Sequence, residues 1–126
     1  MEISPIEPGA RLVVEGYGAG TFKVAGGQVQ GSMLIRYGRF EPWPVTAVTE
    51  VDRGLEALLA LAGDVDLVLL GTGARLEAVA RDVRVRLREV GVVLEVMTTP
   101  AACRTYNVLV AEDRRVAAAL IAMPTV

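Results

Sequence analysis

The feature that most constrains the fold is an apolar run, then a helical pattern, then a second apolar run. Residues 65–70 form the first run, which is typical of a strand covered on both faces. Residues 92–96 form the second. Between them, apolar residues three and four positions apart predict a helix that Gly91 ends: Leu76, Val79, Ala80, Val83, Leu87 and Val90. A strand–helix–strand unit joins parallel neighbours, so the pattern predicts an α/β fold.

Two further helices and a closing strand are predicted around this unit. Thr99 is the expected N-cap of a helix with Pro100 in its first turn, which continues to about Asp113. Residues 115–123, rich in Ala, Leu and Ile, are the expected last strand. An earlier helix, which Gly63 ends, is indicated by apolar residues on one face: Leu55, Leu58, Leu59 and Ala62.

The first third of the chain shows short strands and glycine-rich turns. Residues 12–14 are a strand candidate, and residues 21–24 and 28–36 flank the hairpin signal Ala25-Gly26-Gly27. Pro42-Trp43-Pro44 closes this region and cannot occupy a central strand, because proline has no amide hydrogen. We therefore expect one α/β domain over the whole chain, with a mixed central sheet, helices and a small N-terminal antiparallel β layer.

Composition removes several classes of site. The chain has no histidine and a single cysteine, Cys103. These counts exclude Ser-His-Asp and Cys-His nucleophiles, His-based metal sites, an intrachain disulfide and a paired-cysteine motif. We expect no catalytic residue, no metal and no cofactor. The net charge of −2 gives no overall attraction to nucleic acid.

Location is also an expectation from sequence. The chain starts without the basic segment and apolar run of a secretory signal, and its longest apolar run is too short to span a bilayer. We therefore expect a cytoplasmic protein with no transmembrane segment, which leaves peripheral membrane association open. An apolar content of 52% favours a protein partner or a homodimer.

The first candidate site is a turn that binds an anion. Gly71, Thr72 and Gly73 follow the strand at 65–70, where free amides at a helix start can hold a phosphate, and Thr99 begins the next helix. The alternative is a plain tight turn. Leu76 replaces the third glycine of the dinucleotide pattern, and no phosphate-binding lysine follows.

The second candidate is a binding surface on the third helix. Arg104 and Asn107 lie one turn apart, with Thr105 at the edge of the same face, and they could hold a carboxylate, a phosphate or a partner's backbone. The alternative is a solvent-facing arginine and an amide bonded to nearby main chain. Helical geometry groups Cys103 with the buried face, which favours an inert thiol. Trp43 is either an exposed anchor for a partner or a core residue.

The second helix carries a basic stripe. Arg81, Arg84 and Arg88 share one face, while Glu77 and Asp82 each precede an arginine by four residues and predict ordinary helix-surface pairs. No aromatic residues are interleaved with these arginines, so we expect no nucleic-acid partner.

Several segments spread over the chain carry a family resemblance. They are residues 69–73, 95–97, 101–109 and 115–121, preceded by Tyr17-Gly18, Phe22, Gly31-Ser32 and Trp43. Together they resemble the Mth-nine-three-eight-like family, also called the domain of unknown function four-nine-eight family. The resemblance implies a three-layer α/β fold. The family's eukaryotic branch contains a mitochondrial complex I assembly factor, and no enzymatic activity is established for the family.

Two functions are therefore open. The first is a non-catalytic protein-binding or assembly factor that acts through the surface near Arg104 and Asn107, together with Trp43 if that side chain is exposed. The second is a protein, or an enzyme, that binds a small anion or nucleotide at Gly71–Gly73.

Overall fold

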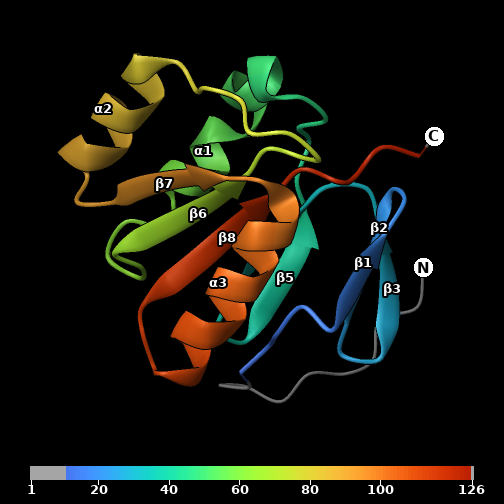
Figure 1. Ribbon diagram of the computed structural model, residues 1–126. Helices are drawn as coiled ribbons and strands as arrows, with labels where there is room; N and C mark the ends of the chain where they lie inside the picture. Colours follow the sequence, from blue (N-terminus) through green and yellow to red (C-terminus); the bar gives the residue numbers. More distant parts are fainter. Residues whose placement is uncertain (1–10, 126) are drawn as a thin grey trace.

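The computed structural model describes residues 11–125, which form two sheets and their covering helices in three layers (Figure 1). A three-stranded antiparallel sheet contains β1 (Gly16–Gly18), β2 (Thr21–Val24) and β3 (Gly27–Gln30). The larger sheet has the order β5-β4-β8-β6-β7. In it β8, β6 and β7 are parallel to one another, and β4 is antiparallel to both of its neighbours, β5 and β8. Its strands are β4 (Met33–Arg36), β5 (Arg39–Pro42), β6 (Leu67–Gly71), β7 (Val93–Met97) and β8 (Val116–Leu120).

Helices cover both faces of the larger sheet (Figure 1). One face packs against the 3-10 helix η1 (Val48–Gly54), α1 (Leu55–Leu59) and α2 (Arg81–Glu89). The other packs against α3 (Thr99–Ala111) and the small sheet. The predicted α/β class, the mixed sheet and the parallel pairing of β6 with β7 are confirmed.

Alternation along the central strands divides the core in two. Val68 and Leu70 of β6 belong to the cluster under α1 and α2, whereas Leu69 between them belongs to the cluster under α3. All three are fully buried, as the continuous apolar run predicted. α3 packs mainly against β8 and β6 and less against β7, so the outer edge of the sheet is covered incompletely on that side.

The N-terminal predictions were partly wrong. The hairpin turn is confirmed, because Ala25 and Gly26 both have positive φ (53° and 77°), as a two-residue hairpin loop requires. Residues 12–14 form no strand, because the Asn107 side chain pairs with the Val14 backbone in place of a neighbouring strand. The predicted strand 28–36 is two strands in different sheets, divided where Gly31 adopts a φ of 80°.

The helix boundaries also differ from prediction. α2 begins at Arg81 and not at Leu76, whose side chain is 67% exposed. The loop over residues 74–80 ends at Ala80, which has an extended ψ of 137°, so the apolar stripe continues through a non-helical segment. α1 ends at Leu59, and a 3-10 helix precedes it. The N-cap of α3 is Thr98, one residue before the predicted Thr99.

The closing strand is shorter than predicted. β8 ends at Leu120, and the Ile121 amide donates the last bond of the parallel ladder to the Gly71 carbonyl at 3.0 Å. Trp43 follows β5, which is an edge strand and so accommodates Pro42 as predicted. None of the helices in residues 11–125 is long and apolar enough to cross a membrane.

Candidate functional site

The carboxyl ends of β6 and β8 meet the start of α3 at Thr99. This side chain is fully buried. Its Oγ1 accepts a hydrogen bond from the Gly73 amide at 2.8 Å and donates one to the Ile121 carbonyl at 2.7 Å. The Thr99 amide donates to the Gly73 carbonyl at 2.9 Å. One hydroxyl therefore joins three segments that are far apart in sequence.

The amides of the candidate anion-binding turn already have partners within the chain. The Thr72 amide donates to the Met97 carbonyl at 2.9 Å, and the Gly73 amide donates to Thr99 Oγ1. The Thr72 hydroxyl donates to the Arg75 carbonyl at 2.5 Å. No helix starts at this turn, because residues 74–80 form a loop. The structure thus lacks the free amides at Thr72 and Gly73 and the helix expected directly after the turn. α3 does start beside the turn at Thr99, but the Thr99 amide is also occupied, by the Gly73 carbonyl.

A hollow does lie beside this turn. It has a volume of about 370 Å³ and is lined in part by Thr46, Thr72, Arg75 and Pro124. It opens where the parallel strands end, which is the edge at which α/β sheets commonly bind ligands. Arg75 is exposed and makes no ion pair within residues 11–125. A second hollow of about 300 Å³, which also has Thr46 and Pro124 in its wall, adjoins it.

The predicted binding surface is only partly assembled. Arg104 is exposed and Thr105 is half-buried beside it. Asn107 is occupied, since its Oδ1 accepts from the Val14 amide at 2.8 Å and its Nδ2 donates to the Val14 carbonyl at 2.9 Å. Trp43 is 3% exposed, and its Nε1 donates to the Gly54 carbonyl at 3.1 Å. Trp43 thus has the core placement that the sequence allowed as an alternative, whereas Asn107 bonds main chain 93 residues away and not the nearby main chain that its alternative expected.

The buried side of α3 carries two ionisable groups that stay neutral at ordinary pH. Burial raises the pKa of Cys103 to about 12, so its thiol is a poor nucleophile. Burial also raises the pKa of Tyr106 above its usual range. The Tyr106 hydroxyl is buried and has no hydrogen-bond partner within the described chain. Both side chains serve the core under α3.

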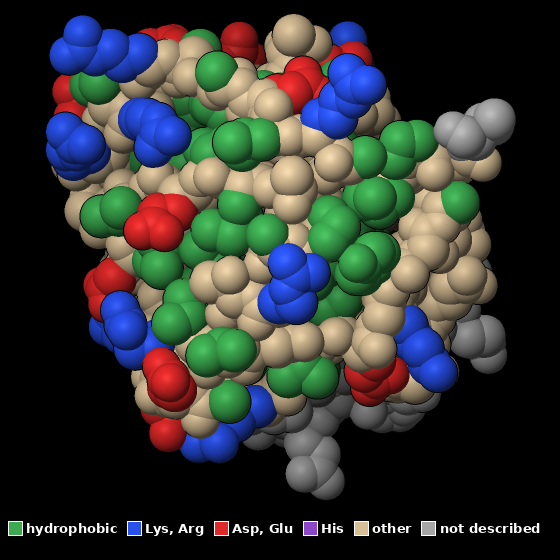
Figure 2. Space-filling view, in the orientation of Figure 1, with side chains coloured by type: hydrophobic (Ala, Val, Ile, Leu, Met, Phe, Trp, Pro, Cys, Tyr) green, Lys and Arg blue, Asp and Glu red, His purple; other side chains and the backbone are tan. Residues whose placement is uncertain are grey.

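The solvent side of α3 is unusually apolar, and sequence reasoning missed this. Val108 is 57% exposed, and Arg104 is the only charged residue of the helix. Val93 on β7, 55% exposed, points to the same side of the sheet as α3. Figure 2 shows hydrophobic side chains gathered over and beside α3, with a single basic side chain among them. We call the surface formed by Val93, Met97, Ala101, Arg104 and Val108 the α3 face. The signal for it was the lack of charge at exposed helical positions.

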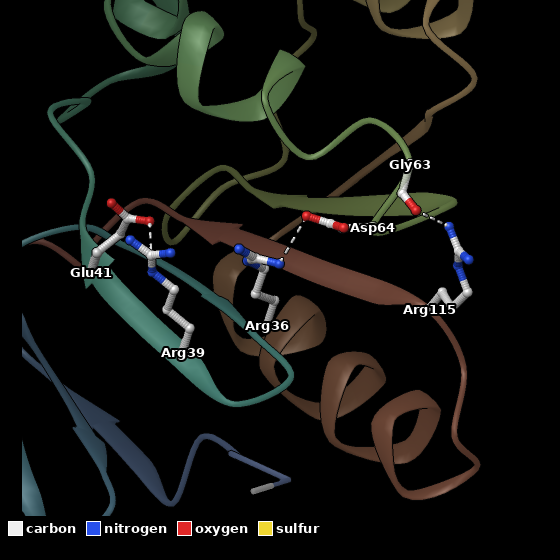
Figure 3. A network of polar contacts seen from close by, with 6 residues as sticks. All are labelled: Arg36, Arg39, Glu41, Gly63, Asp64 and Arg115. Atoms are coloured by element: carbon white, nitrogen blue, oxygen red, sulfur yellow. Dashed lines mark hydrogen bonds and ion pairs between the residues drawn. The ribbon is translucent and has the colours of Figure 1, made fainter. Parts of the chain in front are cut away.

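A charged network lies at the opposite ends of the strands (Figure 3). Arg36 at the end of β4 pairs with Asp64 at 3.4 Å, and Arg115 donates to the Gly63 carbonyl at 2.6 Å. A hollow of about 260 Å³ lies here, with Tyr37 in its wall. Most of these charged side chains are exposed, so each pair contributes at most about 1 kcal/mol to stability. The network holds the strand ends together and offers no candidate chemistry. Within residues 11–125, no cluster of His, Cys, Asp and Glu is suited to hold a metal ion.

The fold and the Thr99 junction define a class of small three-layer α/β domain with a mixed sheet. The chain belongs to a family described as a protein of unknown function (DUF498/DUF598), whose model matches residues 14–121. This confirms the resemblance found in the sequence. The solution structure of a Bordetella pertussis protein, described as a Mth938-like domain, is similar with a TM-score of 0.75 and 27% identity, over 99% of this chain and 93% of that one.

Two relatives and a further structure are more similar. An uncharacterized protein of Rhodobacter capsulatus is 44% identical over 97% of this chain and 95% of its own length. The Danio rerio NADH dehydrogenase [ubiquinone] 1 alpha subcomplex assembly factor 3 is 33% identical over 94% of this chain and 68% of its own length. The Rpa2829 protein of Rhodopseudomonas palustris has a TM-score of 0.82 and 40% identity, over 98% of this chain and 91% of that one.

Proposed function

We propose that this chain is a non-catalytic protein-binding factor of the assembly type, and that it binds through the α3 face. The observation that carries the proposal is the apolar, exposed surface around Arg104, with Val93 and Val108 more than half exposed. The relatives named as NADH dehydrogenase [ubiquinone] 1 alpha subcomplex assembly factor 3 support this kind of function. We place the activity in the cytoplasm and require no cofactor for it.

The composition of the α3 face fits a protein interface. A solvent-facing helix is normally covered by charged and polar side chains, whereas this one presents Ala101, Arg104, Val108 and Ala111 at helical spacing. Interface centres are depleted in charge but enriched in arginine, because guanidinium combines an apolar plane with several donors. A partner would therefore bury the valines and surround the single arginine.

Site-specific photo-crosslinking tests the proposal directly. A photo-reactive amino acid is placed at Val108 or Val93, and at Tyr37 as a control, in the full chain expressed in its own cells. Tyr37 is 50% exposed and lies at the opposite end of the sheet, so it matches the valines in exposure. We expect a protein adduct from the two valine positions and none from Tyr37. Equal adducts at all three positions, or none at the valines, would contradict the proposal.

Charge reversal gives a second readout. Arg104→Glu should reduce the yield of the Val93 adduct at least about tenfold, because truncating or reversing an interface arginine commonly costs about 2 kcal/mol or more. Arg86→Glu is the matched control, since Arg86 is exposed on α2 and has no ion pair within residues 11–125. An adduct made of two copies of this chain would identify the partner as a homodimer.

The hollow beside Arg75 supports a second candidate function, the binding of a small anion. It has less support, because the neighbouring amides of Thr72 and Gly73 are occupied. Inorganic phosphate should then raise the melting temperature of the wild-type chain and not that of Arg75→Gln. No shift in the wild-type chain up to about 10 mM phosphate, roughly the upper range of weak metabolite affinity, would rule the site out.

A further inference from the structure

β7 lies at one edge of the larger sheet, which we call the open edge because no strand pairs with it there within residues 11–125. The Val93 amide donates to the Asp66 carbonyl and the Met97 carbonyl accepts from the Thr72 amide, so the odd-numbered residues of β7 direct their backbone groups toward β6. The backbone groups of Leu94 and Val96 therefore point outward, and no strand pairs with them within residues 11–125. An unpaired row of amides and carbonyls is a template for an added strand.

The other edge of the sheet is protected by its sequence. β5 carries Arg39 and Glu41, both exposed, and ends at Pro42, which has no amide hydrogen to donate. β7 has only one charged residue, Glu95, and no proline. The sequence of β5 thus opposes pairing with a further strand, whereas the sequence of β7 permits it.

A row of arginines lies along the open edge. Arg84 of α2 donates from Nη1 to the outward Leu94 carbonyl at 2.8 Å. Arg81 and Arg88 are three and four residues away and share this flank of the helix. None of the three forms an ion pair within the part of the chain that the structure describes. Figure 2 shows several basic side chains in the region of α2.

The acidic residues of α2 lie on its other flank. At about 100° per residue, Asp82 and Glu89 are separated from Arg84 by about 140° to 160° around the helix axis. Arg86 lies about 160° from Arg84, so it also faces away from the edge. The charge on the α2 side of β7 is therefore positive, although the net charge of the chain is −2, and the one acidic residue of β7, Glu95, lies on the α3 side.

The two faces beside the open edge differ in chemistry. Toward α2 lie the arginines, and toward α3 lie Val93, 55% exposed, the half-buried Met97 and, between them, the exposed Glu95. A strand added at β7 would direct alternate side chains to these two faces. Its α2-facing side chains would meet arginine, and its α3-facing side chains would extend the apolar surface.

We infer that β7 accepts an extended segment of a partner protein as a sixth strand, in which acidic residues facing α2 alternate with apolar residues facing α3. This inference rests on the proposed function and adds the mode of binding and the chemistry of the segment. When the segment pairs, Arg84 releases the Leu94 carbonyl to a partner amide and turns to a partner carboxylate. Backbone pairing supplies affinity, and the alternation supplies specificity.

The experiment begins with display of random dodecapeptides against the immobilised full chain. We expect enrichment of sequences in which Asp or Glu alternates with Val, Ile or Leu. The best peptide is then synthesised and titrated against the ¹⁵N-labelled chain, where it should slow hydrogen exchange of the Leu94 and Val96 amides. Enrichment of no peptide, or protection of other amides in place of these two, would overturn the inference.

Matched variants separate backbone pairing from charge. Arg88→Glu should weaken the selected peptide about tenfold, whereas Arg86→Glu, the same change on the opposite flank, should alter its Kd less than about twofold. Val96→Pro removes one outward amide and should abolish binding, and Val96→Ala keeps that amide and should bind. Equal effects of Arg86→Glu and Arg88→Glu would contradict the charge argument. Displacement of the peptide by single-stranded DNA would identify the stripe as a nucleic-acid surface and overturn the proposal.

The outcomes also distinguish this inference from the proposed function. Crosslinks at Val108 and Val93 without peptide protection at Leu94 and Val96 would leave the α3 face as the interface and remove the added strand. Loss of both the crosslinks and the peptide binding would remove the proposed function itself.

Discussion

Replacing Thr99 with valine is the sharpest test of the junction. Valine has nearly the same shape as threonine, so packing is preserved while the hydroxyl is lost. The substitution leaves the Gly73 amide and the Ile121 carbonyl without the partner that each has in the structure. Both groups lose it in a fully enclosed place, since Thr99 is 0% exposed.

The expected loss follows from these two bonds. A buried donor or acceptor left unpaired costs about 1–3 kcal/mol, so the two together predict a decrease of about 2–6 kcal/mol in the free energy of unfolding. For a chain of 126 residues this corresponds to about 4 °C in melting temperature per kcal/mol. Thr99→Ser keeps the hydroxyl and removes one methyl group, so it should lose only about 1 kcal/mol.

Urea unfolding followed by circular dichroism measures both variants against the wild-type chain. The prediction is that Thr99→Val is clearly less stable than Thr99→Ser, although valine retains more apolar contact. If Thr99→Val were as stable as the wild-type chain, the hydroxyl would not hold the three segments together, and the reasoning about the junction would be refuted.

Three further predictions concern residues near α3. Gly71→Ala should destabilise the chain by about 1–3 kcal/mol, because the added Cβ would lie 2.8 Å from Thr99 Cα, and the loss is measured by urea unfolding. Tyr106→Phe should leave stability unchanged or raise it by up to about 3 kcal/mol in the same assay, since the hydroxyl is buried without a partner. Cys103 should not react with a thiol reagent at about pH 8 until the chain unfolds. Because burial raises its folded pKa to about 12, Cys103 contributes stability that is full below its unfolded pKa and decreases as pH rises from about 9 toward 12.

Each of these has a clear contrary result. Wild-type stability in Gly71→Ala would mean that β6 and α3 separate easily. A loss above about 1 kcal/mol in Tyr106→Phe would show that the hydroxyl has a partner, such as a bound water. Rapid native labelling of Cys103 would show that α3 leaves the sheet frequently.

Periodicity was sufficient for the parts of the fold that bury one continuous surface. Residues 65–70 and 92–96 were identified because apolar runs of that length have few other uses. The start of α2 was missed, since Leu76 continues the helical spacing but lies in a loop where nothing covers it. Spacing alone does not report whether a surface is available to pack against.

The N-terminal layer was harder to predict for a different reason. Gly16–Gly18 contains little apolar surface, yet it forms β1 because β2 supplies a partner. Leu12 and Val14 are apolar and buried but form no strand, because their neighbour is a helix. Whether a segment forms a strand depends on which segment lies beside it in the fold, and the local sequence does not specify that neighbour.

For the candidate site, too, features set by local spacing were predicted and features set by distant contacts were not. Residue types pointed to Arg104 as exposed and to Cys103 as buried, since helical spacing separates the two faces. The occupation of Asn107 by Val14 depends on a contact across 93 residues, and the occupation of Gly73 by Thr99 on one across 26. Such contacts have no local signature. The open edge at β7 became visible only from the strand order.

The pairing of Asn107 with Val14 has a mechanical consequence. Its two hydrogen bonds fix the segment that leads into the small sheet to one turn of α3, directly after Arg104. A ligand that slides or rotates α3 would displace that segment with it, and the three-stranded sheet that follows the segment would move as well. The Asn107 carboxamide therefore couples the position of α3 near Arg104 to the position of the segment at Val14.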